Sequence, residues 1–291
     1  MAEQGVSDNF TDREWTSTDG LVLRYRDHHG SADRPAILCI PGLTRNARDF
    51  EPVVAAFAGE WRVVCPDLRG RGQSDYARDS ASYVPARYVE DVLGLLDAAG
   101  LDRVVAIGTS LGGLVTLRLA LVAPERLAAA VLNDIGPKVE RAGLDRIRES
   151  VGQGRSFPTW VHAARALKEQ MGAVYPDYAL SDWLRLAKRL MCIGAGGRIT
   201  FDYDMRIAEP FEAPPPEEPV DLWAALRALA GRPVLAIRGA LSDILSAETL
   251  ARMARELPGL ETVTVPRTGH VPTLDEPEAQ AAIARLLARV T

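Results

Sequence analysis

Residues 104–113 of this chain read V-V-A-I-G-T-S-L-G-G, an apolar run that passes directly into a Gly-x-Ser-x-Gly motif. Val104–Ile107 has the composition of a buried strand, and the long apolar stretch Leu111–Val122 predicts a helix. A sharp strand-to-helix turn would hold Ser110 in strained backbone with its hydroxyl exposed, and glycines on both sides would let neighbouring segments approach closely. Ser110 is therefore a candidate nucleophile, although the motif alone also fits an ordinary glycine-rich turn.

A serine hydroxyl is a weak nucleophile and needs a base, and the chain has four histidines. His28 and His29 end an early hairpin strand, and His162 lies within a predicted helix. His270 alone follows a late strand, in the loop T-G-H-V-P, at the sheet edge where it could meet Ser110. Imidazole has a suitable pKa to take the serine proton and return it to a leaving group, so His270 is the predicted base.

A carboxylate must orient that histidine, and two aspartates come directly after predicted strands. Asp243 follows residues 234–238, and Asp134 follows residues 128–132. We expect Asp243 to be the acid, because it gives the order serine, acid, histidine and comes from the strand before the strand of His270. Asp134 remains the alternative, with a structural or pocket role expected for it.

Two backbone N–H groups are expected to stabilise a developing oxyanion. One belongs to Leu111, the residue after the candidate nucleophile. The other is assigned to Leu43, in the loop after the first buried strand. There Pro41 fixes its own φ and Gly42 permits an unusual turn, although a plain Pro-Gly turn would look the same.

Outward from the motif, short β-rich runs alternate with amphipathic helical patterns, which is typical of a mostly parallel sheet covered by helices. The fold class predicted is α/β, with an eight-stranded sheet. The predicted strands are 14–18, 21–28, 36–40, 61–66, 104–107, 128–132, 233–238 and 262–265, and the predicted helices are 46–58, 84–99, 111–122, 247–257 and 277–290.

This alternation is interrupted between residues 137 and 219. The segment shows helical periodicity, a glycine-rich stretch at 194–197 and three consecutive prolines at 214–216, but no convincing buried strand. We therefore predict an all-helical insertion, with residues 1–136 and 220–291 forming the core domain.

Composition limits the possible partners. A net charge of -5 leaves no basic surface for nucleic acid or an anionic membrane, and small molecules remain. Residues 1–10 do not resemble a secretory signal, and Arg118 interrupts the longest apolar run, so we expect a cytoplasmic protein. The glycines lack the dinucleotide-binding spacing, and the cysteines lack the spacing of a metal site, so neither cofactor nor metal is expected. The three cysteines are Cys39, Cys65 and Cys192.

From about residue 11 to residue 291, the chain resembles the α/β-hydrolase superfamily, and more narrowly its capped esterase-like members. Ser110 matches the family's nucleophile turn. Where the family most often has His-Gly before the oxyanion donor, this chain has Pro41-Gly42. The other matching segments are the loop D-L-R-G-R-G-Q-S-D at 67–75, the acid loop at 238–243 and the histidine loop at 269–270.

The resemblance implies that residues 137–219 form a lid over the active site. This segment is rich in aromatic residues, most of which should pack the lid itself. A subset facing the serine would make an apolar pocket. The residues expected to contact substrate are Trp160, Trp183, Tyr203 and Val271.

Serine as the nucleophile indicates acyl transfer, since dehalogenases and epoxide hydrolases of this fold need a carboxylate and dienelactone hydrolases need a thiol. We expect hydrolysis of an ester or lactone of a small, largely apolar substrate through an acyl-enzyme. Carbon–carbon bond hydrolysis of a ring-cleavage product is the main alternative, although Val271 stands where those enzymes commonly carry tryptophan. Cofactor-free haloperoxidase activity and a non-catalytic small-molecule receptor are further alternatives.

Overall fold

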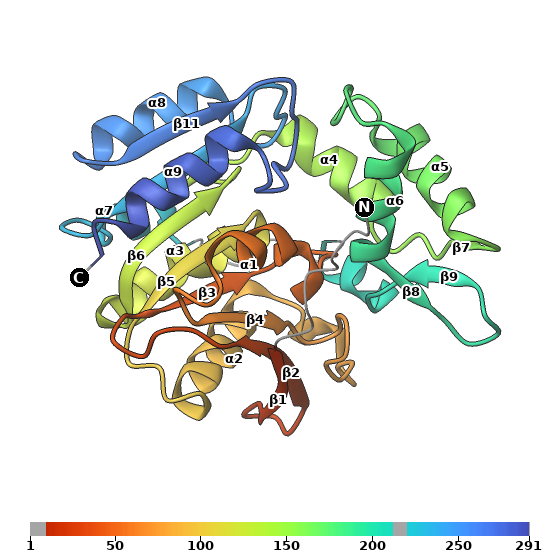
Figure 1. Ribbon diagram of the computed structural model, residues 1–291, viewed down its shortest axis with the longest axis horizontal. Coiled ribbons are helices and arrows are strands. Elements are labelled where there is room, and N and C mark those ends of the chain that lie inside the picture. The colour runs from red at the N-terminus through yellow and green to blue at the C-terminus, as the bar shows by residue number, and fades with distance from the viewer. Residues whose placement is uncertain (1–9, 212–219, 291) are drawn as a thin grey trace.

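The structure is a computed structural model, and it describes residues 10–211 and 220–290. Eight strands form one sheet in the spatial order β1-β2-β4-β3-β5-β6-β10-β11 (Figure 1). The pairs β1–β2 and β2–β4 are antiparallel and the other pairs are parallel, which confirms the predicted mostly parallel eight-stranded sheet. The strands are β1 Phe10–Thr16, β2 Val22–His28, β3 Ala36–Ile40, β4 Val63–Asp67, β5 Val104–Thr109, β6 Leu127–Asn133, β10 Val234–Gly239 and β11 Glu261–Val265.

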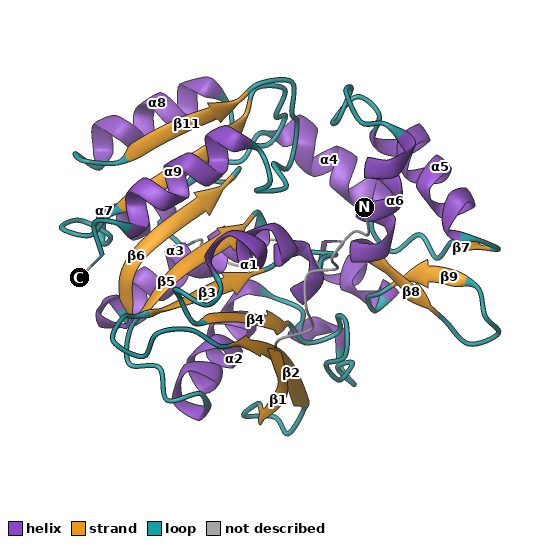
Figure 2. Ribbon diagram, in the orientation of Figure 1, coloured by secondary structure: helices purple, strands orange, loops and turns teal. Residues whose placement is uncertain are grey.

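Helices cover both faces of this sheet (Figure 2). Helices α1 and α9 pack against one face, and α2, α3, α7 and α8 pack against the other. The α-helices are α1 Glu51–Phe57, α2 Pro85–Ala98, α3 Leu111–Val122, α7 Leu222–Arg227, α8 Ala247–Glu256 and α9 Pro277–Leu287. Short 3-10 turns are η1 Ala47–Phe50, η2 Ser80–Ser82 and η3 Pro124–Arg126.

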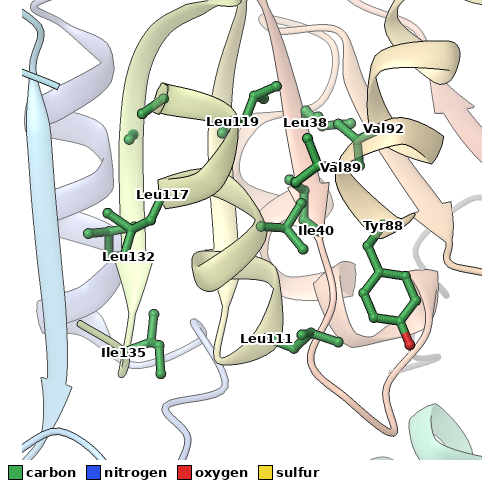
Figure 3. Close-up of a cluster of buried hydrophobic side chains, with 14 of the residues drawn as sticks. Leu38, Ile40, Tyr88, Val89, Val92, Leu111, Leu117, Leu119, Leu132 and Ile135 are labelled. Atoms are coloured by element: carbon green, nitrogen blue, oxygen red, sulfur yellow. The ribbon is translucent and has the colours of Figure 1, made fainter. Parts of the chain in front are cut away.

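Strand β3 shows why the central strands form here. All five of its residues are buried. Because successive side chains of a strand point to opposite faces, Leu38 and Ile40 join the core under α2 and α3 (Figure 3), while Ile37 and Cys39 join the core under α1 and α9. A strand covered on both faces has no polar side, so its sequence is a continuous apolar run.

Residues 137–211 form an insertion between β6 and α7, and Figure 1 shows it grouped beside the carboxyl ends of the parallel strands. The prediction of an all-helical insertion is wrong, because three of its strands form a separate antiparallel sheet in the order β7-β9-β8. Its elements are α4 Arg141–Ser150, β7 Ser156–Phe157, α5 Trp160–Met171, α6 Leu180–Leu190, β8 Met191–Ile193, β9 Ile199–Phe201 and the 3-10 turn η4 Met205–Phe211.

The insertion has a hydrophobic cluster of its own, in which α5 and α6 pack together around Trp183. It also contacts the core domain at several points, such as the ion pair from Arg48 to Asp202 at 2.6 Å. The predicted end of the insertion at residue 219, with the prolines at 214–216, lies outside the described residues. Within 10–211 and 220–290, no helix combines the length and apolar character that crossing a membrane requires.

Candidate functional site

Ser110 occupies the turn between β5 and α3, with φ at 52°, a backbone conformation that side chains rarely adopt. The flanking glycines explain how this turn forms. A β-carbon on Gly112 would overlap the carbonyl oxygen of Ile40, and a β-carbon on Gly108 would overlap the backbone of Gly112. The motif therefore lets β3, β5 and α3 pack closely enough to present Ser110 at the carboxyl end of the sheet.

His270 lies beside the serine, with its Nε2 2.9 Å from Ser110 Oγ. Its loop follows β11 and is held by groups from two directions. Asn133 Nδ2 donates to the Pro272 carbonyl at 2.9 Å, and Tyr175 Oη of the insertion donates to the Val271 carbonyl at 2.6 Å. Burial raises the pKa of Tyr175 to about 12, so the phenol keeps the proton that this contact requires.

The carboxylate behind the histidine is Asp134, whose Oδ2 lies 2.7 Å from His270 Nδ1. Asp134 is fully buried. The backbone N–H of Gly239 donates to its Oδ1 at 2.8 Å, and Ser242 Oγ donates to its Oδ2 at 2.6 Å. With these donors and the histidine, the carboxylate is held in one orientation.

The prediction of Asp243 in this position is corrected by the structure. Asp243 makes a two-point contact with Arg146 of the insertion, from Nε to Oδ2 at 2.6 Å and from Nη2 to Oδ1 at 2.7 Å. These hydrogen bonds hold the pKa of Asp243 below its ordinary value. Its neighbour Ser242 donates to Asp134 instead, so the segment 238–243 contacts Asp134 through the Ser242 hydroxyl and the Gly239 N–H.

The two predicted oxyanion donors lie at the expected ends of their elements. Leu111 is the first residue of α3, where backbone N–H groups have no acceptor within the helix. Leu43 lies in the loop after β3 and lines the same cavity as Ser110. The Leu43 carbonyl accepts a hydrogen bond from Arg71 Nε at 2.9 Å, a contact that fixes this loop and that the sequence did not predict.

A cavity of about 470 Å³ lies over Ser110, between the core and the insertion. Of the predicted substrate contacts, Tyr203 and Val271 line it. Trp160 and Trp183 do not, so their prediction is wrong. Trp183 is 1% exposed and packs edge-on against Tyr175 and Tyr178 inside the insertion.

The cavity lining is more charged than the predicted apolar pocket. Arg45, Arg146 and Arg155 supply cationic side chains to it, and Glu149 and Glu169 supply carboxylates. Apolar side chains, such as those of the leucines at 167 and 190, line the remainder. The cavity is therefore suited to a molecule with both an apolar and an anionic part.

Among the described residues, no three or more His, Cys, Asp and Glu side chains gather in a way that could hold a metal ion.

Comparisons with known proteins identify the family and several relatives. A family model described as the alpha/beta hydrolase family matches residues 37–283. The chain is 35% identical over 269 residues to a 3-hydroxybutyrate-oligomer hydrolase of Cupriavidus necator, covering 90% of this chain and 91% of that protein. It is 27% identical over 279 residues to a 2-(acetamidomethylene)succinate hydrolase of Mesorhizobium japonicum, covering 96% and 95%.

Among solved structures, the crystal structure of an alpha/beta hydrolase from Novosphingobium aromaticivorans is similar with a TM-score of 0.93. The two sequences are 60% identical, and the match covers 97% of this chain and 99% of that one. The fold and the hydrolase assignment therefore have support from whole-length relatives as well as from the geometry.

Proposed function

The chain belongs to the α/β hydrolase family, and we propose that within this family it is a serine esterase that uses Ser110, His270 and Asp134 as its catalytic triad. One observation carries this proposal. A continuous line of hydrogen bonds joins Ser110 Oγ to His270 Nε2 at 2.9 Å and His270 Nδ1 to Asp134 Oδ2 at 2.7 Å, beside a cavity. This is the arrangement that a serine needs to become a nucleophile.

In the first half of the reaction, Ser110 Oγ attacks the ester carbonyl carbon while His270 Nε2 takes the hydroxyl proton. Asp134 stabilises the resulting imidazolium through Nδ1–H. The tetrahedral intermediate then expels the alkoxide, which receives the proton from Nε2 and leaves as an alcohol. The acyl group remains on Ser110 as an ester.

In the second half, a water molecule gives a proton to His270 and attacks the acyl-enzyme carbonyl. The carboxylic acid is released and the proton returns to Ser110. The N–H groups of Leu43 and Leu111 would stabilise the oxyanion in both halves, and each such donor is worth about 10²–10³-fold in kcat. Arg71 would support this by fixing the loop next to that N–H, through its hydrogen bond to the Leu43 carbonyl.

The residues 137–211 would act as the lid over this site. Tyr203 and Phe201 of the insertion line the cavity, together with Val271 of the histidine loop. Because the 35% identical relative is named a 3-hydroxybutyrate-oligomer hydrolase, short oligomers of hydroxyacids joined by ester bonds are the first substrates to test. A lactone of similar size would react by the same steps.

The experiment is labelling with a fluorophosphonate, followed by mass spectrometry and by hydrolysis assays. We expect one adduct on Ser110, and hydrolysis of hydroxybutyrate oligomers that falls by roughly 10⁶-fold in Ser110→Ala. Ser150→Ala is the matched control, because Ser150 lines the same cavity but, among the described residues, its hydroxyl donates only to the Ile147 carbonyl of its own helix. A folded protein that takes no label, or full turnover in Ser110→Ala, would contradict the proposal. Preference for a ring-cleavage dienoate would favour carbon–carbon hydrolysis.

A further inference from the structure

Arg146 lines the cavity, and one edge of its guanidinium has no partner among the described residues. Its Nε and Nη2 are used by Asp243. Within 10–211 and 220–290, its Nη1 makes neither a hydrogen bond nor an ion pair, and the side chain is 39% exposed. The edge formed by Nη1 and Nη2 can therefore donate two parallel hydrogen bonds to a ligand in the cavity.

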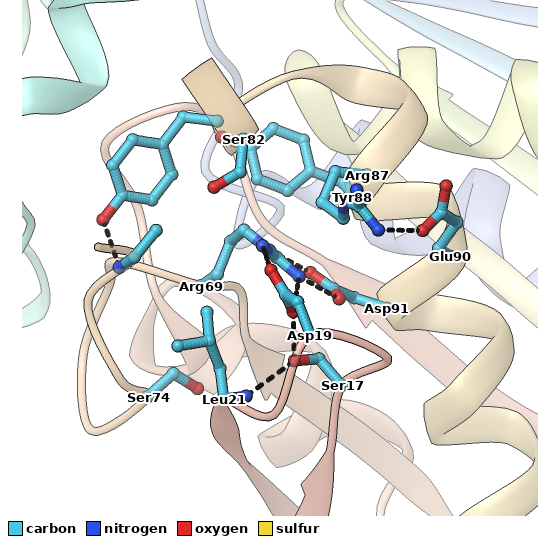
Figure 4. A network of polar contacts seen from close by, with 12 residues as sticks. Ser17, Asp19, Leu21, Arg69, Ser74, Ser82, Arg87, Tyr88, Glu90 and Asp91 are labelled. Carbon is cyan, nitrogen blue, oxygen red and sulfur yellow. Dashed lines mark hydrogen bonds and ion pairs between the residues drawn. The ribbon is translucent and has the colours of Figure 1, made fainter. Parts of the chain in front are cut away.

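Arg69 shows in the same molecule how a guanidinium binds two carboxylates at once (Figure 4). Its Nε and Nη2 donate to Asp91, both at 2.6 Å. Its Nη1 and Nη2 donate to Asp19 at 2.8 and 3.0 Å. Arg146 uses the same edge for Asp243 that Arg69 uses for Asp91. A ligand carboxylate on the remaining edge would complete the same arrangement.

The position of Arg146 indicates which part of the substrate it faces. Its partner Asp243 directly follows Ser242, whose hydroxyl donates to Asp134, the partner of His270. Arg146 therefore lies on the histidine side of the site. Since the histidine must reach the leaving oxygen to protonate it, the alcohol portion of an ester lies on this side.

Other charged groups in the cavity do not cancel this cation. Glu149 and Glu169 are exposed side chains, where water and salt screen their charge. The cation Arg45 already has an ion-pair partner in Asp49 at 3.1 Å. Arg146 lines the cavity and is held in a fixed orientation by two short hydrogen bonds to Asp243.

We propose that Arg146 binds a free carboxylate on the alcohol portion of the ester, and that Asp243 is the positioning residue that orients Arg146. The substrate class is then the acyl ester of a hydroxyacid, with the acid group unesterified. This inference rests on the proposed esterase function. It gives Asp243 the role of holding a recognition group in place of the catalytic role that its position in the sequence predicted.

The experiment compares 3-acetoxybutanoate with its neutral analogue 3-acetoxybutanamide, which present the same reacting ester. Release of acetate gives kcat and KM for each. The wild type should prefer the acid by about 10- to 100-fold in kcat/KM, chiefly through KM, as expected for a charge-assisted pair. Arg146→Gln should abolish most of this preference. Arg148→Gln is the matched control, since Arg148 lies on the same helix, pairs with Asp145 and does not line the cavity.

Asp243→Asn supplies a second variant with a separate expectation. It should raise KM for the acid with little change in kcat, and Asp243→Glu should restore part of the preference. Equal kcat/KM for the two esters in the wild type, or an unchanged preference in both Arg146→Gln and Asp243→Asn, would overturn the inference while leaving the esterase function intact. Failure to hydrolyse either ester, together with no fluorophosphonate label on Ser110, would overturn the esterase function itself.

Discussion

Replacing Asp134 by asparagine separates the two candidate acids by their effect on catalysis. In the structure, Asp134 Oδ2 accepts from both His270 Nδ1 and Ser242 Oγ, and Oδ1 accepts from the Gly239 N–H. An asparagine can keep its oxygen toward Gly239, but its NH₂ then faces His270. The ring must accept there, so the proton moves to Nε2, which can no longer take the proton of Ser110.

This wrong tautomer is expected to lower kcat on the order of 10⁴-fold, or about 5.4 kcal/mol of transition-state stabilisation. The assay is hydrolysis of p-nitrophenyl acetate, a neutral ester, with unfolding midpoints measured in parallel to show that the variant is folded. Asp243→Asn, which removes the partner of Arg146 but no contact of His270, should lower kcat by less than about tenfold. A larger loss in Asp243→Asn than in Asp134→Asn would refute the assignment of the acid.

Three further predictions test other parts of the molecule. Trp183→Phe should change kcat/KM by less than about twofold, because the indole packs inside the insertion and its Nε1 has no partner among the described residues. A large rise in KM would show instead that Trp183 contacts the substrate. Gly112→Ala should destabilise the fold by about 1–3 kcal/mol or more in urea unfolding, because its β-carbon would overlap the Ile40 carbonyl, and unchanged stability would show that the turn can relax. The hydrogen bond from Arg69 holds the pKa of Asp19 far below its ordinary value of 3.8, so the ionised form stabilises the fold above that value and the contribution is lost as pH falls through the folded-state pKa. Asp19→Asn should therefore be less stable than wild type at neutral pH. If the difference in the free energy of unfolding between the two proteins does not become smaller below about pH 4, the prediction is contradicted.

The core elements could be predicted from sequence because their signals are local and strong. The predicted bounds of β3 and α3 agree with the structure. A run such as A-I-L-C-I has no polar face, and a Leu-rich helix between Ser110 and Pro124 has few other conformations open to it. Ser110 and His270 were predicted for a related reason, since each follows a strand and few residues in the chain could take their roles.

The strands of the insertion could not be predicted in this way. Strands β7, β8 and β9 contain only two or three residues each, so no period-2 alternation can develop. The glycine-rich stretch at 194–197 lies in the turn that joins β8 to β9. A glycine-rich turn between the short segments 191–193 and 199–201 is therefore the signal in the sequence that indicates a hairpin.

The acid was assigned incorrectly because chain order does not distinguish the two aspartates. Both Asp134 and Asp243 lie between Ser110 and His270 in sequence, and each follows a parallel strand. The difference is conformational. Asp134 has φ at 55°, directly at the end of β6, and this turn accompanies the contact of its carboxylate with the histidine. The sequence does not indicate that turn, because Asp and Asn tolerate a positive φ and no glycine is needed there.

The different partners of Asp134 and Asp243 show how the insertion is linked to the proposed catalytic groups. Because the buried Asp134 partners His270, Asp243 is available for Arg146 of α4. Ser242 connects Asp134 with Asp243, because its hydroxyl donates to Asp134 and it directly precedes Asp243 in sequence. A shift of α4 would therefore reach the acid through two adjacent residues of one loop. Groups that act through a shared contact do not have independent effects, so the loss in a double variant of Arg146 and Ser242 should differ from the sum of the two single losses, and strict additivity would show that the loop transmits nothing.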